Sequence, residues 1–146
     1  MKKLKLIPVL ALLFMLNVAS MCSNDDNSNS STPTPINNIV TSGAWRVTLY
    51  NENGSNQTSD FTGYNFTMNA NGALTAVKDS TTKTGTWSTY IDSGATKFDI
   101  SFPDTDGPFE SISDDWLVLT STSSKIELKH VSGGDGSIDL LTFEKN

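Results

Sequence analysis

The stretch Lys125-Ile126-Glu127-Leu128-Lys129-His130-Val131 decides the fold, because apolar and charged residues alternate along it. Successive side chains of a β-strand point to opposite faces, so Ile126, Leu128 and His130 share one face and the charged residues share the other. A segment with this pattern has one buried face and one wet face. It therefore predicts a half-buried strand in an antiparallel sheet.

The chain from residue 42 onward has the same character. Short runs rich in aromatic and β-branched residues alternate with clusters of Gly, Asn, Asp and Ser, and no stretch keeps a helical period. The longest link, Pro103–Asp115, is expected to contain one short helical turn between the fifth and sixth strands. Eight strands are expected: Ala44–Asn51, Thr62–Asn69, Ala73–Lys78, Lys83–Ile91, Lys97–Phe102, Trp116–Thr120, Lys125–Val131 and Ile138–Glu144.

Alternation also assigns the inward faces of these strands. Trp45, Val47 and Leu49 share one face, and Trp87 shares a face with Ile91. Eight strands joined by hairpins, each with one wet face, close most economically into a barrel, which leaves no exposed edge. We therefore expect an all-β, eight-stranded antiparallel up-and-down barrel, with a two-sheet sandwich as the alternative. A membrane-spanning barrel is disfavoured, because its strands need about 9–11 residues and an apolar outer face.

The first residues have the parts of a secretory signal. Three lysines precede an apolar run from Leu6 to Leu16, which is much shorter than the ~20 residues needed to span a bilayer. The only cysteine follows in Val18-Ala19-Ser20-Met21-Cys22, a tract that resembles the lipobox of bacterial lipoproteins. The resemblance implies cleavage before Cys22 and a lipid anchor on its sulfur. The alternative is an ordinary secreted protein with an incidental cysteine.

These assignments divide the chain into three parts. Residues 1–21 are expected to be the signal peptide, residues 22–41 a lipidated, disordered tether, and residues 42–146 the barrel domain. Ser23-Asn24-Asp25-Asp26 resembles the acidic export signal of Bacteroidota lipoproteins, which implies the outer membrane and display on the cell surface; an acidic linker is the alternative. Removing the signal would leave seven basic and sixteen acidic residues, a formal charge of about −9. This charge argues against binding nucleic acid.

Two Gly-x-Trp triplets, Gly43-Ala44-Trp45 and Gly85-Thr86-Trp87, lie on the first and fourth expected strands. Together with Asp114-Asp115-Trp116, they make the block from Trp45 to Lys145 resemble the lipocalin-like surface lipoproteins of Bacteroidota. That family implies an eight-stranded calyx and no established ligand. In lipocalins an arginine stacks on the first tryptophan, but Arg46 is the only arginine here and lies on the first strand.

Catalytic residue types are scarce. His130 is the only histidine, so it is the one natural general base, and no second histidine completes a usual zinc site. No nucleophile elbow is present. We expect no enzyme, no cofactor and no metal; an esterase-like use of His130 is the third-ranked alternative. The acidic groups around the long loop, Asp104 with Asp106 and Glu110 with Asp114 and Asp115, match no known calcium loop.

The leading hypothesis is a non-enzymatic barrel that binds a small apolar or amphipathic ligand at an open mouth near Tyr64, Met68 and the Gly54–Asp60 loop. The candidate ligand-binding residues are Tyr64, Met68, Trp87 and His130. The alternative is an adhesin or accessory subunit that binds a protein or glycan, because an eight-stranded barrel is just wide enough to be filled by its own side chains. The membrane, through the lipid on Cys22, is the other expected partner. The chain is expected to be a monomer. Around Ser80, Asp79-Ser80-Thr81 resembles the O-glycan site of exported Bacteroidota proteins.

Overall fold

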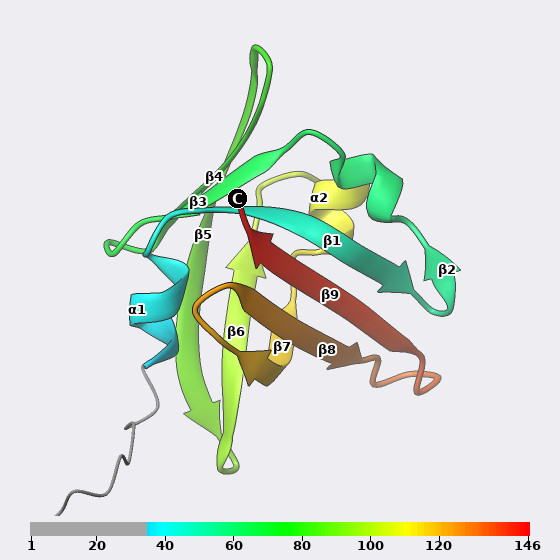
Figure 1. Ribbon diagram of the computed structural model, residues 1–146. Helices are drawn as coiled ribbons and strands as arrows, with labels where there is room; N and C mark the ends of the chain where they lie inside the picture. The colour runs from blue at the N-terminus through cyan, green and yellow to red at the C-terminus, as the bar shows by residue number, and fades with distance from the viewer. Residues whose placement is uncertain (1–34) are drawn as a thin grey trace, which may run out of the picture. The chain divides into compact units, whose positions relative to one another are not determined.

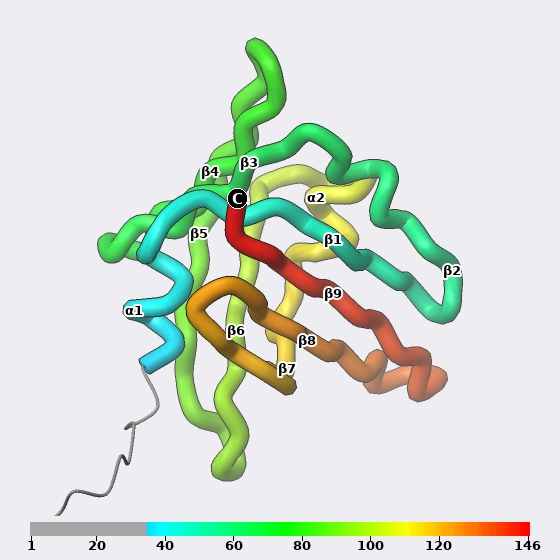
Figure 2. Tube along the Cα trace, in the orientation of Figure 1, coloured from blue at the N-terminus to red at the C-terminus, as the bar shows by residue number. Residues whose placement is uncertain are grey.

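The computed structural model describes residues 35–146 (Figures 1 and 2), so the expected signal and Cys22 lie outside the described residues. Nine strands and three short helical segments follow one another along this part of the chain. Within it, no helix is long and apolar enough to cross a membrane. The elements are α1 (Ile36–Val40), β1 (Ala44–Glu52), β2 (Ser55–Asn56), the 3-10 helix η1 (Thr58–Phe61), β3 (Asn65–Met68), β4 (Ala73–Lys78), β5 (Thr81–Asp92), β6 (Ala95–Ser101), α2 (Pro108–Ser111), β7 (Asp115–Ser121), β8 (Lys125–Val131) and β9 (Ile138–Lys145).

Eight of the strands form a closed antiparallel barrel. Each strand pairs with the next along the chain, in the order β1, β3, β4, β5, β6, β7, β8, β9, and β9 then pairs with β1. The expected up-and-down barrel is therefore confirmed, and the two-sheet sandwich is excluded. The additional strand, β2, has two residues and only extends the end of β1, where Asn51 pairs with Asn56. The expected helical turn is also confirmed, as α2 between β6 and β7.

The inward face of β1 differs from the prediction. Trp45 and Val47 are buried as expected, but the pairing with β9 shifts register between Val47 and Leu49. A β-bulge adds one residue to a strand and so turns the following side chains to the other face. Tyr50 is therefore buried in place of Leu49, which is only partly buried.

Trp87 and Ile91 also differ in burial, although they share a face of β5. Trp87 is 6% exposed, whereas Ile91 is 69% exposed. Ile91 pairs with Thr96 in the hairpin between β5 and β6, which continues past the core. Alternation identified the face correctly, but the barrel ends before Ile91 is reached.

Gly85 allows β5, β6 and the residue after β6 to approach one another closely. A Cβ atom at this position would lie 2.3 Å from the backbone oxygen of Ser101 and 2.9 Å from the ring of Phe102. Real side chains do not tolerate such distances, so glycine here creates room for the Phe102 ring. Phe102 is in turn buried in the core, 5% exposed. The second Gly-x-Trp triplet therefore has a packing role.

Helix α1 lies in the range that the sequence assigns to the tether. Its apolar residues Ile36, Ile39 and Val40 follow helical spacing, and the last two are buried. The indole Nε1 of Trp45 donates a hydrogen bond of 2.8 Å to the carbonyl oxygen of Val40. The folded domain therefore includes Ile36–Val40, and the expected boundary at residue 42 corresponds to the first strand only.

Candidate functional site

The barrel has two different ends (Figure 1). At the end that we call the α1 end, β1 begins, β9 finishes and α1 packs beside them. At the opposite end, the α2 end, β1 finishes, β8 connects to β9, and η1 and α2 lie over the opening. Only these ends offer room for a functional site, because buried core side chains occupy the interior between them.

The four residues expected to bind a ligand do not line one cavity. Met68 and Trp87 are buried, and the Nε1 of Trp87 donates a 2.9 Å hydrogen bond to the carbonyl oxygen of Asn69. Tyr64 packs at the α2 end, with its ring centroid 5.0 Å from that of Phe109. His130 is the one that lines the open pocket described below. The expected mouth near Tyr64 is therefore occupied by protein.

Phe109 of α2 fills that mouth. Its ring lies edge-on to those of Phe61, Tyr64 and Phe102, with centroid distances of 5.7, 5.0 and 4.8 Å, and stacks on Phe66 at 6.2 Å. The ring is 3% exposed. Tyr64, which the sequence assigned to the mouth, thus packs together with three phenylalanines around the ring of Phe109, which we call the plug.

Polar contacts hold α2 in place over the barrel. The Tyr50 hydroxyl donates to the carbonyl oxygen of Ser111 at 3.2 Å, and burial raises the pKa of this tyrosine. The Trp116 Nε1 donates to the carbonyl oxygen of Ile112 at 3.0 Å. The Ser113 hydroxyl donates to the carbonyl oxygen of Phe109 at 2.6 Å and accepts from the backbone N–H of Phe102 at 2.9 Å. Hydrogen bonds from β1, from β7 and from the residue after β6 therefore fix α2 and the residues that follow it.

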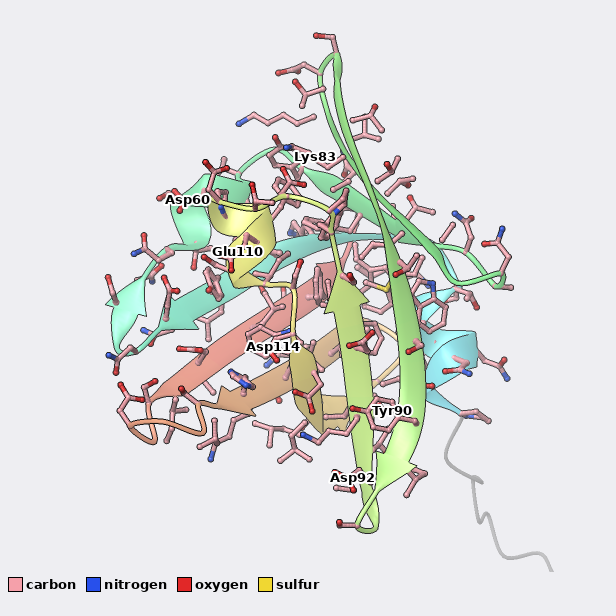
Figure 3. The ribbon with its side chains drawn as sticks, turned by 180° about the vertical axis from the view of Figure 1, so that it is seen from behind. Asp60, Lys83, Tyr90, Asp92, Glu110 and Asp114 are labelled. Atoms are coloured by element: carbon pink, nitrogen blue, oxygen red, sulfur yellow. The ribbon has the colours of Figure 1, made fainter. Side chains whose placement is uncertain are left out.

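An open polar pocket of about 550 Å³ lies beside α2. Figure 3 shows two of its acidic residues, Glu110 on α2 and Asp114 directly before β7. Glu52 at the end of β1 and Asp139 on β9 also line it. Among the described residues that line the pocket, His130 is the only one that can carry a positive charge. The pocket is therefore acidic.

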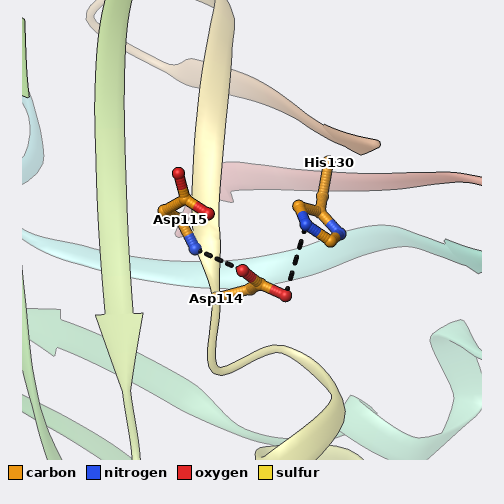
Figure 4. A group of neighbouring side chains, drawn as sticks. All are labelled: Asp114, Asp115 and His130. Atoms are coloured by element: carbon orange, nitrogen blue, oxygen red, sulfur yellow. Dashed lines mark hydrogen bonds and ion pairs between the residues drawn. The ribbon is translucent and has the colours of Figure 1, made fainter. Parts of the chain in front are cut away.

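His130 lies between two of these carboxylates. Its Nε2 is 3.4 Å from Oδ2 of Asp114 (Figure 4), and its Nδ1 is 3.5 Å from Oδ2 of Asp139. The preceding inward residues of β8, Ile126 and Leu128, are fully buried, whereas the His130 side chain is 21% exposed. The expected inward orientation is thus compatible with an opening to solvent, because the barrel ends at this level.

Each of the two carboxylates is oriented by the backbone. Asp114 Oδ1 accepts a 2.7 Å hydrogen bond from the N–H of Asp115 (Figure 4). Asp139 Oδ1 accepts one of 2.8 Å from the N–H of Asn53. In both residues the second oxygen faces the imidazole of His130. The edge of the Trp116 ring packs against that imidazole, with a centroid distance of 5.9 Å. The side chains of this group are therefore held in place by neighbouring protein groups.

Asp115 has a different electrostatic environment. Its Oδ2 lies 3.1 Å from the Nζ of Lys97, and this hydrogen bond lowers the pKa of the carboxyl group. Burial, with Asp115 and Asp114 nearby, raises the pKa of the adjacent Asp99. Another loop carboxylate weighed for calcium, Asp104, pairs with Lys83 and does not line the pocket. Asp104 and Asp115 thus pair with lysines, whereas Glu110 and Asp114 line the pocket.

Asp139, like Glu52, is a pocket residue that the sequence did not identify. It lies directly opposite His130 in the pairing of β8 with β9. Correct pairing of these two expected strands across the loop Ser132–Gly136 would have placed the two side chains together. The register, not the residue type, is the signal that could have identified it.

A lysine lies near the ring of Trp45, the tryptophan on which the lipocalin resemblance would place an arginine. The Nζ of Lys145 lies 5.9 Å from the ring centroid of Trp45, and it is 3.0 Å from the Ser42 hydroxyl. Lys145 also borders a second pocket of about 440 Å³ at the α1 end.

At the tip of the hairpin between β4 and β5, Ser80 is exposed, so the glycan prediction concerns an accessible residue.

Comparisons with known proteins support the fold only. No protein-family model matches the chain, and no curated protein matches it. Among solved structures, the chain is similar to a protein of the DUF4847 family from Bacteroides vulgatus ATCC 8482, with a TM-score of 0.53 and 18% sequence identity. The similarity covers 77% of this chain and 98% of that protein. At this identity it shows a shared barrel architecture.

Proposed function

We propose that this protein is a non-enzymatic, lipid-anchored binding module of the cell surface that binds its partner with the outside of a filled barrel. The packing around Phe109 carries this proposal. A carrier of the lipocalin type needs an apolar cavity that is open at one end. Here the residues that would line it, including Met68 and Trp87, pack in the core, and α2 covers the opening.

The surface at the α2 end favours an interaction role. The pocket there is open and acidic, and its carboxylates are oriented by backbone N–H groups. Such a surface suits a partner with complementary positive charge. The similarity to a Bacteroides protein of the same architecture is consistent with a bacterial origin of the fold and adds no activity.

A lipophilic-dye titration tests the filled barrel. The chain from Ser23 onward, which retains α1, is expected to show no saturable binding of a fluorescent fatty-acid analogue, because Phe109 and its neighbours occupy the space. The matched variant Phe109→Ala removes the plug side chain and is expected to bind small apolar molecules in the space it leaves. Saturable 1:1 binding to the unaltered chain, with quenching of tryptophan fluorescence, would show that the protein is a carrier.

Surface display has a separate test. Protease treatment of intact cells is expected to remove the domain, since the acidic residues after Cys22 are proposed to direct it outward. A double variant, Asp25→Ala with Asp26→Ala, is expected to become protected from the protease. Asn27→Ala with Asn29→Ala is the matched control and should remain accessible. Equal cleavage of both variants would leave Asp25 and Asp26 without a targeting role.

A further inference from the structure

The group at the acidic pocket has the composition of a metal site. Asp114, Asp115 and His130 each offer one ligand atom, and these atoms lie within 4.8 Å of one another. Imidazole nitrogen with carboxylate oxygen is a donor set that suits zinc and other divalent transition metals. Calcium and magnesium prefer oxygen ligands throughout, so the histidine disfavours them.

The separation of the donor atoms supports this assignment. His130 Nε2 and Asp114 Oδ2 are 3.4 Å apart. Two ligands of a tetrahedral ion with bonds of about 2.1 Å lie about 3.4 Å apart. The observed spacing fits two ligands of one ion.

The surroundings of His130 add a second, independent feature. A histidine that binds a metal usually donates its other ring N–H to a carboxylate, which fixes the ring and the tautomer. Here Nδ1 faces Oδ2 of Asp139 at 3.5 Å, while the other oxygen of Asp139 is held by the backbone of Asn53. This arrangement leaves Nε2 directed at Asp114. Trp116 packs on the ring and restricts it further.

Charge and space also fit. Glu52 and Glu110 line the same pocket, and no lysine or arginine is among the described residues that line it. A cation would therefore relieve repulsion between the carboxylates. The volume of about 550 Å³ leaves room for water ligands. Asp115 lies beside the pocket and not in its lining, and its Oδ2 pairs with Lys97 at 3.1 Å, so it would be the weakest ligand of the three.

From this geometry we propose that the pocket binds one divalent transition-metal ion of the zinc class. His130 Nε2 and Asp114 Oδ2 are its main ligands, Asp115 is the third, and water completes the coordination. Asp139 is a positioning residue that acts through His130. This site goes beyond the proposed binding module: it depends on the pocket, not on whether the barrel interior is filled.

Cobalt and zinc titrations test the site. The full chain with its anchor, in non-ionic detergent and after treatment with a chelator, is expected to bind one Co²⁺ with visible absorption bands and to release it to Zn²⁺. His130→Asn and Asp114→Asn are expected to weaken binding at least 100-fold. Asp139→Asn is expected to weaken it about 10–100-fold while the cobalt bands persist at saturation, because the ligands remain.

The control is Asp79→Asn, which removes an exposed carboxylate at the tip of the β4–β5 hairpin. Its affinity should equal that of the unaltered chain, and thermal melting without metal checks that each variant is folded. Absence of stoichiometric binding to the unaltered chain would overturn the proposal, as would unchanged affinity in both folded ligand variants. Either result would leave the dye experiment, and so the filled barrel, unaffected.

Discussion

Phe109→Ala is expected to lower the free energy of unfolding by about 3–5 kcal/mol, the usual cost of truncating a buried phenylalanine. The ring is buried among Phe61, Tyr64, Phe66 and Phe102, so the vacated space has apolar walls on several sides. Those walls come from η1, from β3 and the residue before it, and from the residue after β6, and the cost depends on how little these segments can close the space. Chemical denaturation followed by tryptophan fluorescence measures the loss.

Ile91→Ala is the matched control for this measurement. It also removes an apolar side chain, but Ile91 is 69% exposed. Its effect is expected to stay within about 0.5 kcal/mol, as is usual for exposed positions. If Phe109→Ala costs no more than Ile91→Ala, then α2 is not a plug and the barrel mouth opens in solution.

Cys22→Ser is expected to abolish labelling by fatty-acid analogues and to move the protein from the membrane fraction to the soluble fraction. Without the expected signal the chain would have a formal charge of about −9, which argues against binding to anionic lipid through a basic patch. Membrane binding must then come from acyl chains, at ~0.8 kcal/mol per buried CH₂, and stable anchoring needs more than one chain. Removing the sulfur removes all of it.

Ser31→Ala, a substitution of similar size farther along the expected tether, is the control and should leave labelling and fractionation unchanged. Both measurements are made on the same cells. Labelling that persists in Cys22→Ser would place the anchor elsewhere. Movement of Ser31→Ala to the soluble fraction would show that the fractionation procedure, and not the loss of the cysteine, releases the protein.

Alternation along the strands predicted the barrel, because burial of one face is a property of each strand taken alone. Ile126 and Leu128 were placed inward from their neighbours in the sequence, and both are buried. The burial of Tyr50 in place of Leu49 could not be predicted in this way. It depends on a bulge in the pairing of β1 with β9, which are neighbours in the barrel but lie at opposite ends of the domain's sequence.

The candidate site shows the same limit. His130 and Asp114 were both considered from the sequence, but in different roles and without a contact between them. They meet because α2 leads the chain back to β7 beside the end of β8. Asp139 enters through the register of β8 and β9. Helix α1 was missed because five residues carry too weak a pattern; its burial depends on contacts such as that of Val40 with Trp45.

The two ends of the barrel give the molecule a direction. The chain enters through α1, and the last residue returns to the same end, where the N–H of Asn146 bonds to the carbonyl oxygen of Ala44. His130 and the plug lie at the far end of the strands. A lipid-anchored tether ahead of α1 would thus hold the domain at its α1 end. The acidic pocket, at the α2 end, would then face away from the lipid headgroups and toward the surroundings of the cell.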